Sequence, residues 1–334
     1  MPRNRFYQGP VSDHFDGQRF HAPVEPPKNS LLQLAWMNTV KAARFWPVVT
    51  PPAKFDVPPR RVRHLRIGPI GHASVLVQVD GSNLLIDPVY APRLGPVPNT
   101  GPKRAQPPGI RIDDLPPIDA VLITHNHYDH MDVPAILRIA REHGARIIAP
   151  LGNDTILRRH DPALRVEIHD WGDRTPLSDR LTLHFEPSFH WSGRGVNDRG
   201  MTLWCSFVIT GAEGGVLYHV GDTGYGDGSI FPRIRDRYGP PDAALLPIGA
   251  YEPRLLMRGS HCTPEEAVAI GRDWGAARLC AMHWGTIQLT DEPPFEPPGR
   301  FRAAASAAGY AGEDVWTLAI GETRILDALG AVPA

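Results

Sequence analysis

The chain has 334 residues, of which 42% are hydrophobic, so it is long enough for one large domain or two ordinary ones. Its net charge of −1 at pH 7 gives no overall positive field, and we expect no nucleic acid among its partners. Three cysteines do not form the paired framework of a secreted protein. Because no signal-like N-terminus and no run of about 18 apolar residues is present, we expect a cytoplasmic protein.

Residues 1–63 differ from the rest of the chain and are interpreted as an N-terminal extension. They are rich in proline and aromatic residues and carry ten Lys or Arg against four Asp or Glu, a net charge of +6. The apolar spacing predicts one helix, Ser30 to Phe45, stopped by Pro47. Its Leu and Trp residues favour either peripheral contact with anionic lipid at the inner membrane or packing over the main domain.

Residues 64–334 are predicted to form one domain in which groups of strands alternate with helices. The expected strands are Ser74–Val79, Asn83–Ile86, Ala120–Thr124, Arg146–Ala149, Leu181–Phe185, Leu203–Thr210, Val216–Val220, Ala243–Pro247, Leu279–His283 and Val315–Ile325. The expected helices are Val133–Glu142, Pro264–Trp274 and Arg300–Ala308. This order favours two sheets packed face to face with helices outside.

One run of residues carries most of the chemistry. The apolar strand that ends at Thr124 leads directly into His125-Asn126-His127-Tyr128-Asp129-His130, which places four potential metal ligands within six residues. Side chains at i and i+2 of a strand point to the same side, so His125 and His127 can reach one metal ion. Asp129 and His130 follow and can reach a second. Imidazole and carboxylate ligands suit Zn²⁺, and also Fe²⁺ and Mn²⁺.

Three further candidate ligands follow later strands. His190 comes after the strand that ends at Phe185, Asp222 comes after the strand that ends at Val220, and His283 ends the strand that begins at Leu279. In each case an apolar strand delivers one polar group to its end. Taken singly, each is as easily an ordinary buried or surface residue. Together they indicate one site assembled at a common sheet edge.

These motifs resemble the metallo-β-lactamase superfamily and, more narrowly, the family of N-acyl-phosphatidylethanolamine-hydrolysing phospholipase D. The resemblance covers roughly residues 64–290. It rests on the following segments: Gly71-His72-Ala73-Ser74, Leu85-Ile86-Asp87-Pro88, Gly101-Pro102-Lys103-Arg104, His125–His130, His190-Trp191-Ser192, Gly221–Tyr225, Pro247–Arg254 and His283-Trp284-Gly285-Thr286.

The resemblance implies a fold, a ligand set and supporting residues. The fold is an α/β class αβ/βα four-layer sandwich with two mixed β-sheets, and the cofactors are two divalent metal ions, with Zn²⁺ expected. One ion would be held by His125, His127 and His190, the other by Asp129, His130 and His283, with Asp222 bridging both. The resemblance also places Asp87 and His261 in the catalytic site together with Asp129. It implies that Asp87 orients a metal ligand and that His261 lies beside the substrate. The alternatives are that Asp87-Pro88 is a simple turn and that His72 and His261 have purely structural roles.

The predicted activity is hydrolysis of a small-molecule or lipid phosphodiester by a hydroxide that the two metals share. His261 would protonate the leaving alkoxide. The same ligand set also allows hydrolysis of another ester-like bond, such as a lactone, a cyclic phosphodiester or a nucleotide. A non-catalytic metal-binding protein is a further alternative, although all seven ligand positions are filled. The oligomeric state is not predicted.

Overall fold

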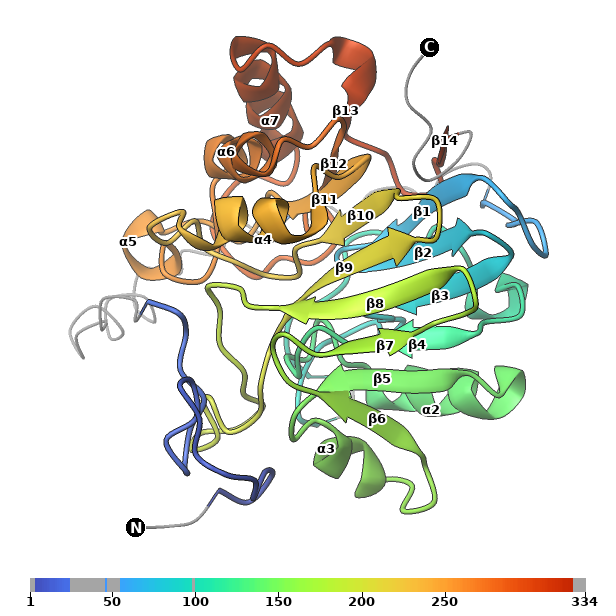
Figure 1. The fold of residues 1–334 in the computed structure, drawn as a ribbon, viewed down its shortest axis with the longest axis vertical. Helices are drawn as coiled ribbons and strands as arrows, with labels where there is room; N and C mark the ends of the chain where they lie inside the picture. Colours follow the sequence, from blue (N-terminus) through green and yellow to red (C-terminus); the bar gives the residue numbers. More distant parts are fainter. Residues whose placement is uncertain (1–3, 25–45, 47–54, 98–99, 327–334) are drawn as a thin grey trace.

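The computed structural model describes residues 4–24, 46, 55–97 and 100–326, and these form two sheets of seven strands each (Figure 1). The first sheet has the order β14 (Arg324–Leu326), β1 (Leu65–Gly71), β2 (Ser74–Val79), β3 (Ser82–Ile86), β4 (Ala120–Leu122), β5 (Arg146–Pro150) and β6 (Val166–His169). The second has the order β13 (Val315–Trp316), β12 (Leu279–Met282), β11 (Ala243–Pro247), β10 (Val216–His219), β9 (Ser206–Gly211), β8 (Leu181–Glu186) and β7 (Arg174–Pro176). Both sheets are mixed, since each contains antiparallel and parallel pairs.

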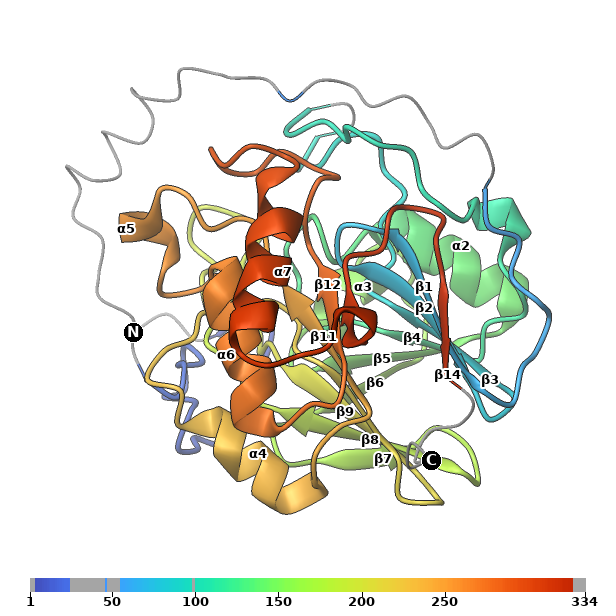
Figure 2. The same cartoon turned by 90° about the horizontal axis from the view of Figure 1, so that it is seen from above.

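Helices cover the outer face of each sheet, which gives four layers (Figure 2). The helices are α2 (Val133–His143), α3 (Asp154–Arg158), α4 (Ile230–Tyr238), α5 (Arg254–Met257), α6 (Pro264–Trp274) and α7 (Glu296–Ala307). Helix α2 lies over the first sheet, whereas α4, α6 and α7 lie over the second. This arrangement is the sandwich that the sequence predicts.

The alternation of side chains along the strands builds the three apolar interfaces between the four layers. On β2, Val75 and Val77 face the core between the sheets, while Leu76 faces the α2 side. On β9, Phe207 faces the same central core and Val208 faces the helices of the second sheet. Neighbouring side chains on a strand point to opposite faces, so a strand buried on both sides is apolar almost throughout.

The N-terminal residues 4–24 pack against the sandwich through an aromatic cluster. Phe15 and Phe20 are buried with Leu203 and Trp204. The backbone of this segment is also tied to the body, because the Phe20 N–H donates to the Gly200 carbonyl at 2.7 Å. Residues 4–24 of the predicted extension therefore pack against the body of the domain. The predicted helix from Ser30 to Phe45 lies outside the described residues.

Most predicted elements are confirmed, with shifts of a few residues at their ends. The strands Ser74–Val79 and Ala243–Pro247 and the helix Pro264–Trp274 have the predicted bounds. Helix α6 begins with a capping box in which Thr263 accepts from the Glu266 N–H and Glu266 accepts from the Thr263 N–H.

One predicted strand is wrong, and several elements are not predicted: β1, β6, β7, α3, α4 and α5. The segment Val315–Ile325 is not a single strand, because the chain turns after Trp316, leaves the second sheet and joins the first sheet as β14. Strand β1 was missed because Gly68 and Pro69 interrupt its apolar pattern. Helix α4 was missed because it contains Pro232 and buries only three apolar side chains.

We predict that the attachment of residues 4–24 weakens at high pH. In its charged form the His14 ring donates from Nε2 to Asp170 at 2.7 Å and from Nδ1 to Asp13 at 2.6 Å. Burial opposes the charged imidazole, but the two carboxylates outweigh it and raise the pKa of His14 above its usual 6.5. Because the pKa of His14 is raised in the folded state, its contribution to the stability of this attachment is complete below about pH 6.5. The contribution is lost as the pH rises through the folded-state pKa.

Amide hydrogen exchange measured at several pH values checks this prediction. Protection of residues 4–24, corrected for the intrinsic exchange rate, should fall above the His14 pKa in the wild type. In His14→Gln the same protection should be lower at acidic pH and insensitive to pH in this range. A pH-dependent loss of protection in His14→Gln equal to that of the wild type would contradict the role of His14.

Candidate metal centre

Strands of both sheets end at the same edge of the sandwich and deliver the predicted ligands there. In the first sheet, β4 ends at Leu122 and is followed by the loop with His125–His130, after which α2 begins with Asp132 as its N-cap. In the second sheet, β8, β10 and β12 are followed by His190, Asp222 and His283. Residues that are far apart in the sequence thus meet in space, as the sequence analysis expects.

The first set of ligands brings three imidazoles together. His125 Nε2 lies 2.8 Å from His127 Nδ1, and His190 Nε2 lies 3.2 Å from the same atom. The opposite nitrogen of His190, Nδ1, donates to the Ser260 carbonyl at 2.9 Å. This hydrogen bond assigns the proton to Nδ1 and leaves Nε2 with a free lone pair facing the cluster.

The second set combines one carboxylate with two imidazoles. Asp129 Oδ2 lies 3.6 Å from His130 Nε2 and 3.4 Å from His283 Nε2. All three residues are buried. The structure therefore groups these three residues as the resemblance implies.

Asp222 lies between the two sets. Its Oδ2 is 3.2 Å from His130 Nε2, 3.7 Å from His190 Nε2 and 4.0 Å from His125 Nε2. Its Oδ1 is 3.3 Å from His283 Nε2. One carboxylate thus contacts imidazoles of both sets, which is the position that a bridging ligand requires.

The donor atoms fit a bound cation. His127 Nε2, His130 Nε2, His283 Nε2 and Asp222 Oδ1 are buried and have no hydrogen-bond partner of good geometry among the described residues. Leaving several buried polar atoms unpaired is unfavourable unless another group satisfies them. A set of imidazoles and carboxylates suits Zn²⁺, Fe²⁺ or Mn²⁺. The cluster can therefore hold metal ions. The donor atoms alone do not determine which metal binds or how many ions are bound.

The electrostatics of the two sets differ. Burial lowers the pKa of His127 and of His190 to about 3, so both imidazoles are neutral, which is the form that binds metal. Burial also opposes charge on His283, but Asp222 and Asp129 outweigh it and raise its pKa to about 9. The two carboxylates thus draw positive charge to the second set.

Asp87 holds the start of the ligand loop and one ligand, His130, through hydrogen bonds. Its carboxylate accepts hydrogen bonds from the Thr124 N–H at 2.8 Å, the Thr124 hydroxyl at 2.5 Å and His130 Nδ1 at 2.7 Å. The last bond orients His130 so that Nε2 faces the cluster. The contact with His130 fits the role that the resemblance implies for Asp87, and the two contacts with Thr124 hold the residue that leads into the ligand loop.

Two further histidines border the cluster. His72 Nε2 contacts Asp129 Oδ2 at 2.9 Å, and its ring lies 3.8 Å from the His283 ring, centroid to centroid. Both His72 and His283 have left-handed backbones, with φ of 59° and 61°, which is uncommon for residues other than glycine. His261 Nδ1 lies 3.9 Å from Asp222 Oδ2. His72 thus contacts the second set, and His261 faces the bridging position.

A cavity of about 510 Å³ opens directly onto the cluster. His127, Asp129, Asp222 and His261 form its polar floor. Its walls are largely apolar and include Leu94, Trp191, Pro253, Met257 and Leu289. A substrate in this cavity would therefore place a reactive group over the cluster and an apolar group against the walls.

Comparison with known proteins identifies the family. The Beta-lactamase superfamily domain model matches residues 82–284. An N-acyl-phosphatidylethanolamine-hydrolysing phospholipase D of Caenorhabditis elegans is 34% identical over 71% of this chain and 69% of its own length. The chain belongs to the metallo-β-lactamase superfamily and, within it, to the N-acyl-phosphatidylethanolamine-hydrolysing phospholipase D-like family.

Other relatives agree with this placement. An uncharacterised protein of Mycobacterium tuberculosis is 38% identical over 72% of this chain, and the match spans only 64% of that relative's length. The structure of a metallo-hydrolase from Ignicoccus hospitalis has a TM-score of 0.58 at 23% identity, covering 78% of this chain and 98% of its own, which shows the shared fold. The chain is thus a metallo-β-lactamase superfamily member with a histidine and aspartate cluster that can hold a metal ion.

Arg194 is a residue of this metallo-β-lactamase site that the sequence analysis did not single out. Its Nη1 donates to the Asn126 carbonyl at 2.8 Å and to the Met131 carbonyl at 2.9 Å, at the two ends of the ligand loop. Its guanidinium lies 3.8 Å from the Tyr128 ring centroid. Asn126 itself accepts from the Gly193 N–H at 2.7 Å. We call the two hydrogen bonds from Arg194 to the ligand loop the arginine clamp. No local sequence pattern indicates it, because it joins loops more than sixty positions apart.

We predict that His127→Ala lowers the metal content of the purified protein and removes most hydrolytic activity. The substitution deletes one imidazole from the first set, while the surrounding β-sheets keep the fold. Elemental analysis by mass spectrometry, circular dichroism and a bis(p-nitrophenyl) phosphate assay measure the three properties. A folded His127→Ala protein with full metal content and full activity would rule out the proposed ligand role.

We predict that Arg194→Met weakens metal binding by roughly 10-fold or more, the lower end of the effect seen when a group supporting a metal ligand is removed. The variant loses both bonds to the ligand loop, so the loop positions its side chains less well. Competition with a fluorescent chelator measures the affinity. Arg138→Met is the matched control, because Arg138 is an exposed arginine of α2 that pairs with Glu142 on the surface. Equal losses in the two variants would argue against the clamp.

Proposed function

We propose that this protein is a metal-dependent hydrolase, a phosphodiesterase of the N-acyl-phosphatidylethanolamine phospholipase D type. The observation that carries the proposal is the cluster of histidine and aspartate side chains at the floor of a cavity with apolar walls. The Caenorhabditis elegans relative, named for hydrolysis of N-acyl-phosphatidylethanolamine, supports the substrate class. A lipid phosphodiester combines the two features that such a cavity selects, a reactive anionic group and long apolar chains.

The ligands would hold two divalent metal ions in the grouping described above, with Zn²⁺ the expected metal. When bound, such a pair lowers the pKa of a water molecule and neutralises charge on phosphoryl oxygens. The residues of the chain keep the ligands in place, since Asp87 orients His130 and His72 contacts Asp129. The apolar walls exclude water from the rest of the cavity, which strengthens electrostatic interactions at the floor.

Hydrolysis forms a bond between a water oxygen and phosphorus and breaks the bond between phosphorus and the alcohol oxygen. The products are a phosphate monoester and an alcohol, and the leaving oxygen must receive a proton. His261 lines the cavity beside Asp222 and is the group placed to pass that proton, directly or through a water.

We predict that Asp222→Asn reduces turnover of N-acyl-phosphatidylethanolamine more strongly than His261→Ala. Asp222 contacts both sets of ligands, whereas His261 would act only on the leaving group, an effect of about 10²-fold to 10⁴-fold. Release of phosphatidic acid and N-acylethanolamine, followed by mass spectrometry, measures turnover. The opposite order of effects would mean that the bridging position is misassigned.

The same assay separates the rival activities. Wild-type protein loaded with metal would be tested in parallel on a lactone, a cyclic phosphodiester and a nucleotide. Faster turnover of one of these than of the lipid would replace the phospholipase proposal with that activity. Full metal binding without turnover of any substrate would instead favour a non-catalytic metal-binding protein.

Contact with a membrane through the N-terminal extension remains a proposal. Within the described residues, no helix combines the length and apolar character needed to cross a bilayer. Trp46, an aromatic residue of the extension, is held against the body of the protein. Its N–H donates to the Gln288 side chain at 3.0 Å and its indole N–H to the Glu292 carbonyl at 3.1 Å. Lipid contact would therefore depend on other residues of the extension.

A further inference from the structure

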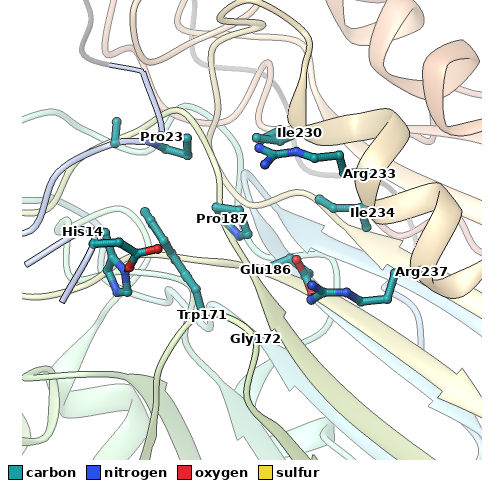
Figure 3. A pocket seen from close by; sticks show the side chains of 12 residues that line it. His14, Pro23, Trp171, Gly172, Glu186, Pro187, Ile230, Arg233, Ile234 and Arg237 are labelled. Atoms are coloured by element: carbon teal, nitrogen blue, oxygen red, sulfur yellow. Dashed lines mark hydrogen bonds and ion pairs between the residues drawn. The ribbon is translucent and has the colours of Figure 1, made fainter.

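A second cavity, of about 420 Å³, lies between three segments that are distant in the sequence (Figure 3). The N-terminal segment forms one side, α4 forms the opposite side, and the end of β8 with the loop at Trp171 forms the floor. None of the residues that line this cavity lines the cavity over the metal centre. The proposed hydrolase function leaves it without a role.

Trp171 gives this second cavity a flat aromatic wall. The His14 ring is stacked on one face of the indole, with centroids 4.5 Å apart and an interplanar angle of 27°. The indole N–H donates to the Trp204 carbonyl at 2.6 Å, which holds the ring in place. In Figure 3 the face away from His14 is turned toward Pro187 and α4, and Pro23 lies above the indole in this view. This wall is suited to a planar ring.

Two arginines of α4 line the opposite side of the cavity, and they differ in their partners. Arg237 donates to Glu186 at 2.8 Å, and Glu186 also accepts from the Tyr238 hydroxyl at 2.5 Å. Arg233 is directed into the cavity in Figure 3 and uses only its Nε, in a 3.3 Å bond to the Ser229 carbonyl. Among the described residues, its two terminal nitrogens have no hydrogen-bond or ion-pair partner.

The contacts of the charged lining residues leave Arg233 as the one with open hydrogen-bond donors. Glu186 accepts from Arg237, and Asp13 is paired with His14, whose other ring nitrogen contacts Asp170. Asp227 is close enough to Arg233 for that positive charge to lower the pKa of Asp227, but the Asp227 carboxylate accepts its hydrogen bonds from Ser229. A guanidinium with free N–H groups is the usual partner of a phosphate or carboxylate.

We propose that this cavity binds a small anion that carries a planar ring, with the ring on Trp171 and the anionic group on Arg233. Trp171 is held in place by Trp204 and His14, and Arg233 points into the cavity. The N-terminal segment completes the site, which gives a physical reason for its tight packing against the body. The ligand class is defined by this chemistry, and aromatic carboxylates and nucleoside monophosphates both belong to it.

Adenosine monophosphate is the probe that tests the site, because it joins a planar ring to a phosphate. Isothermal titration calorimetry should show binding to the full-length wild type. Arg233→Gln should weaken it at least tenfold, whereas Arg141→Gln, which changes an exposed arginine of α2, should leave it unchanged. Arg233 is exposed, so its variant should retain the wild-type melting temperature. Equal affinity of wild type and Arg233→Gln, or no binding by the wild type, would overturn the proposal.

Two further titrations separate the parts of the ligand. Adenosine and inorganic phosphate should each bind the wild type at least tenfold more weakly than adenosine monophosphate. Phosphate binding as tight as the nucleotide would show a simple anion site and overturn the role of Trp171. Adenosine binding as tight as the nucleotide would overturn the role of Arg233.

The metal centre could itself bind a phosphate, so the titration is repeated in His127→Ala, which alters that centre and leaves the second cavity intact. Unchanged affinity would support the proposed site. Loss of binding in His127→Ala would place the nucleotide over the metal centre and overturn the proposal. This outcome is independent of whether the protein hydrolyses phospholipid, since turnover is measured separately.

Discussion

The structure depends on one edge of the sandwich at which buried strands of both sheets end in imidazoles and carboxylates. The arrangement is unfavourable by itself, because each polar side chain loses water and several donor atoms have no partner among the described residues. Opposite charges compensate part of this penalty, most clearly where Asp222 contacts imidazoles of both sets. The donors must therefore be held rigidly, and much of the surrounding structure serves that purpose.

The rigidity comes from layers of support around the ligand loop. Asp87, at the end of β3, holds the loop from the core side through Thr124 and His130. Arg194 holds it from the cavity side through two loop carbonyls. Because these contacts attach to the loop at different points, no single neighbour controls its conformation. The sheets beneath supply the fixed reference frame, with three apolar interfaces between four layers.

The fold and the ligands were predictable to different depths. Alternating apolar residues and helix caps were enough to place β2, β11 and α6, because these elements are determined by local pattern. The segment from Val315 to Ile325 was misread as one strand, since its pattern does not show that its two ends belong to different sheets. The packing of residues 4–24 against the body is made largely by aromatic residues without regular spacing, so the sequence pattern did not indicate these contacts.

By itself the sequence determined the fold class, the seven candidate ligands and the chemistry that imidazole and carboxylate allow, because these follow from local spacing and residue type. The grouping of the ligands and the place of Asp222 between them were expected only through the family resemblance, and the tertiary structure brings these residues together. Only the tertiary structure decided that Arg194 clamps the loop. It also brought residues near positions 14, 171 and 233 around a second cavity. The physical reason is the same in each case: these relations join segments whose separation along the chain is long, and packing rather than local pattern sets the distances between them.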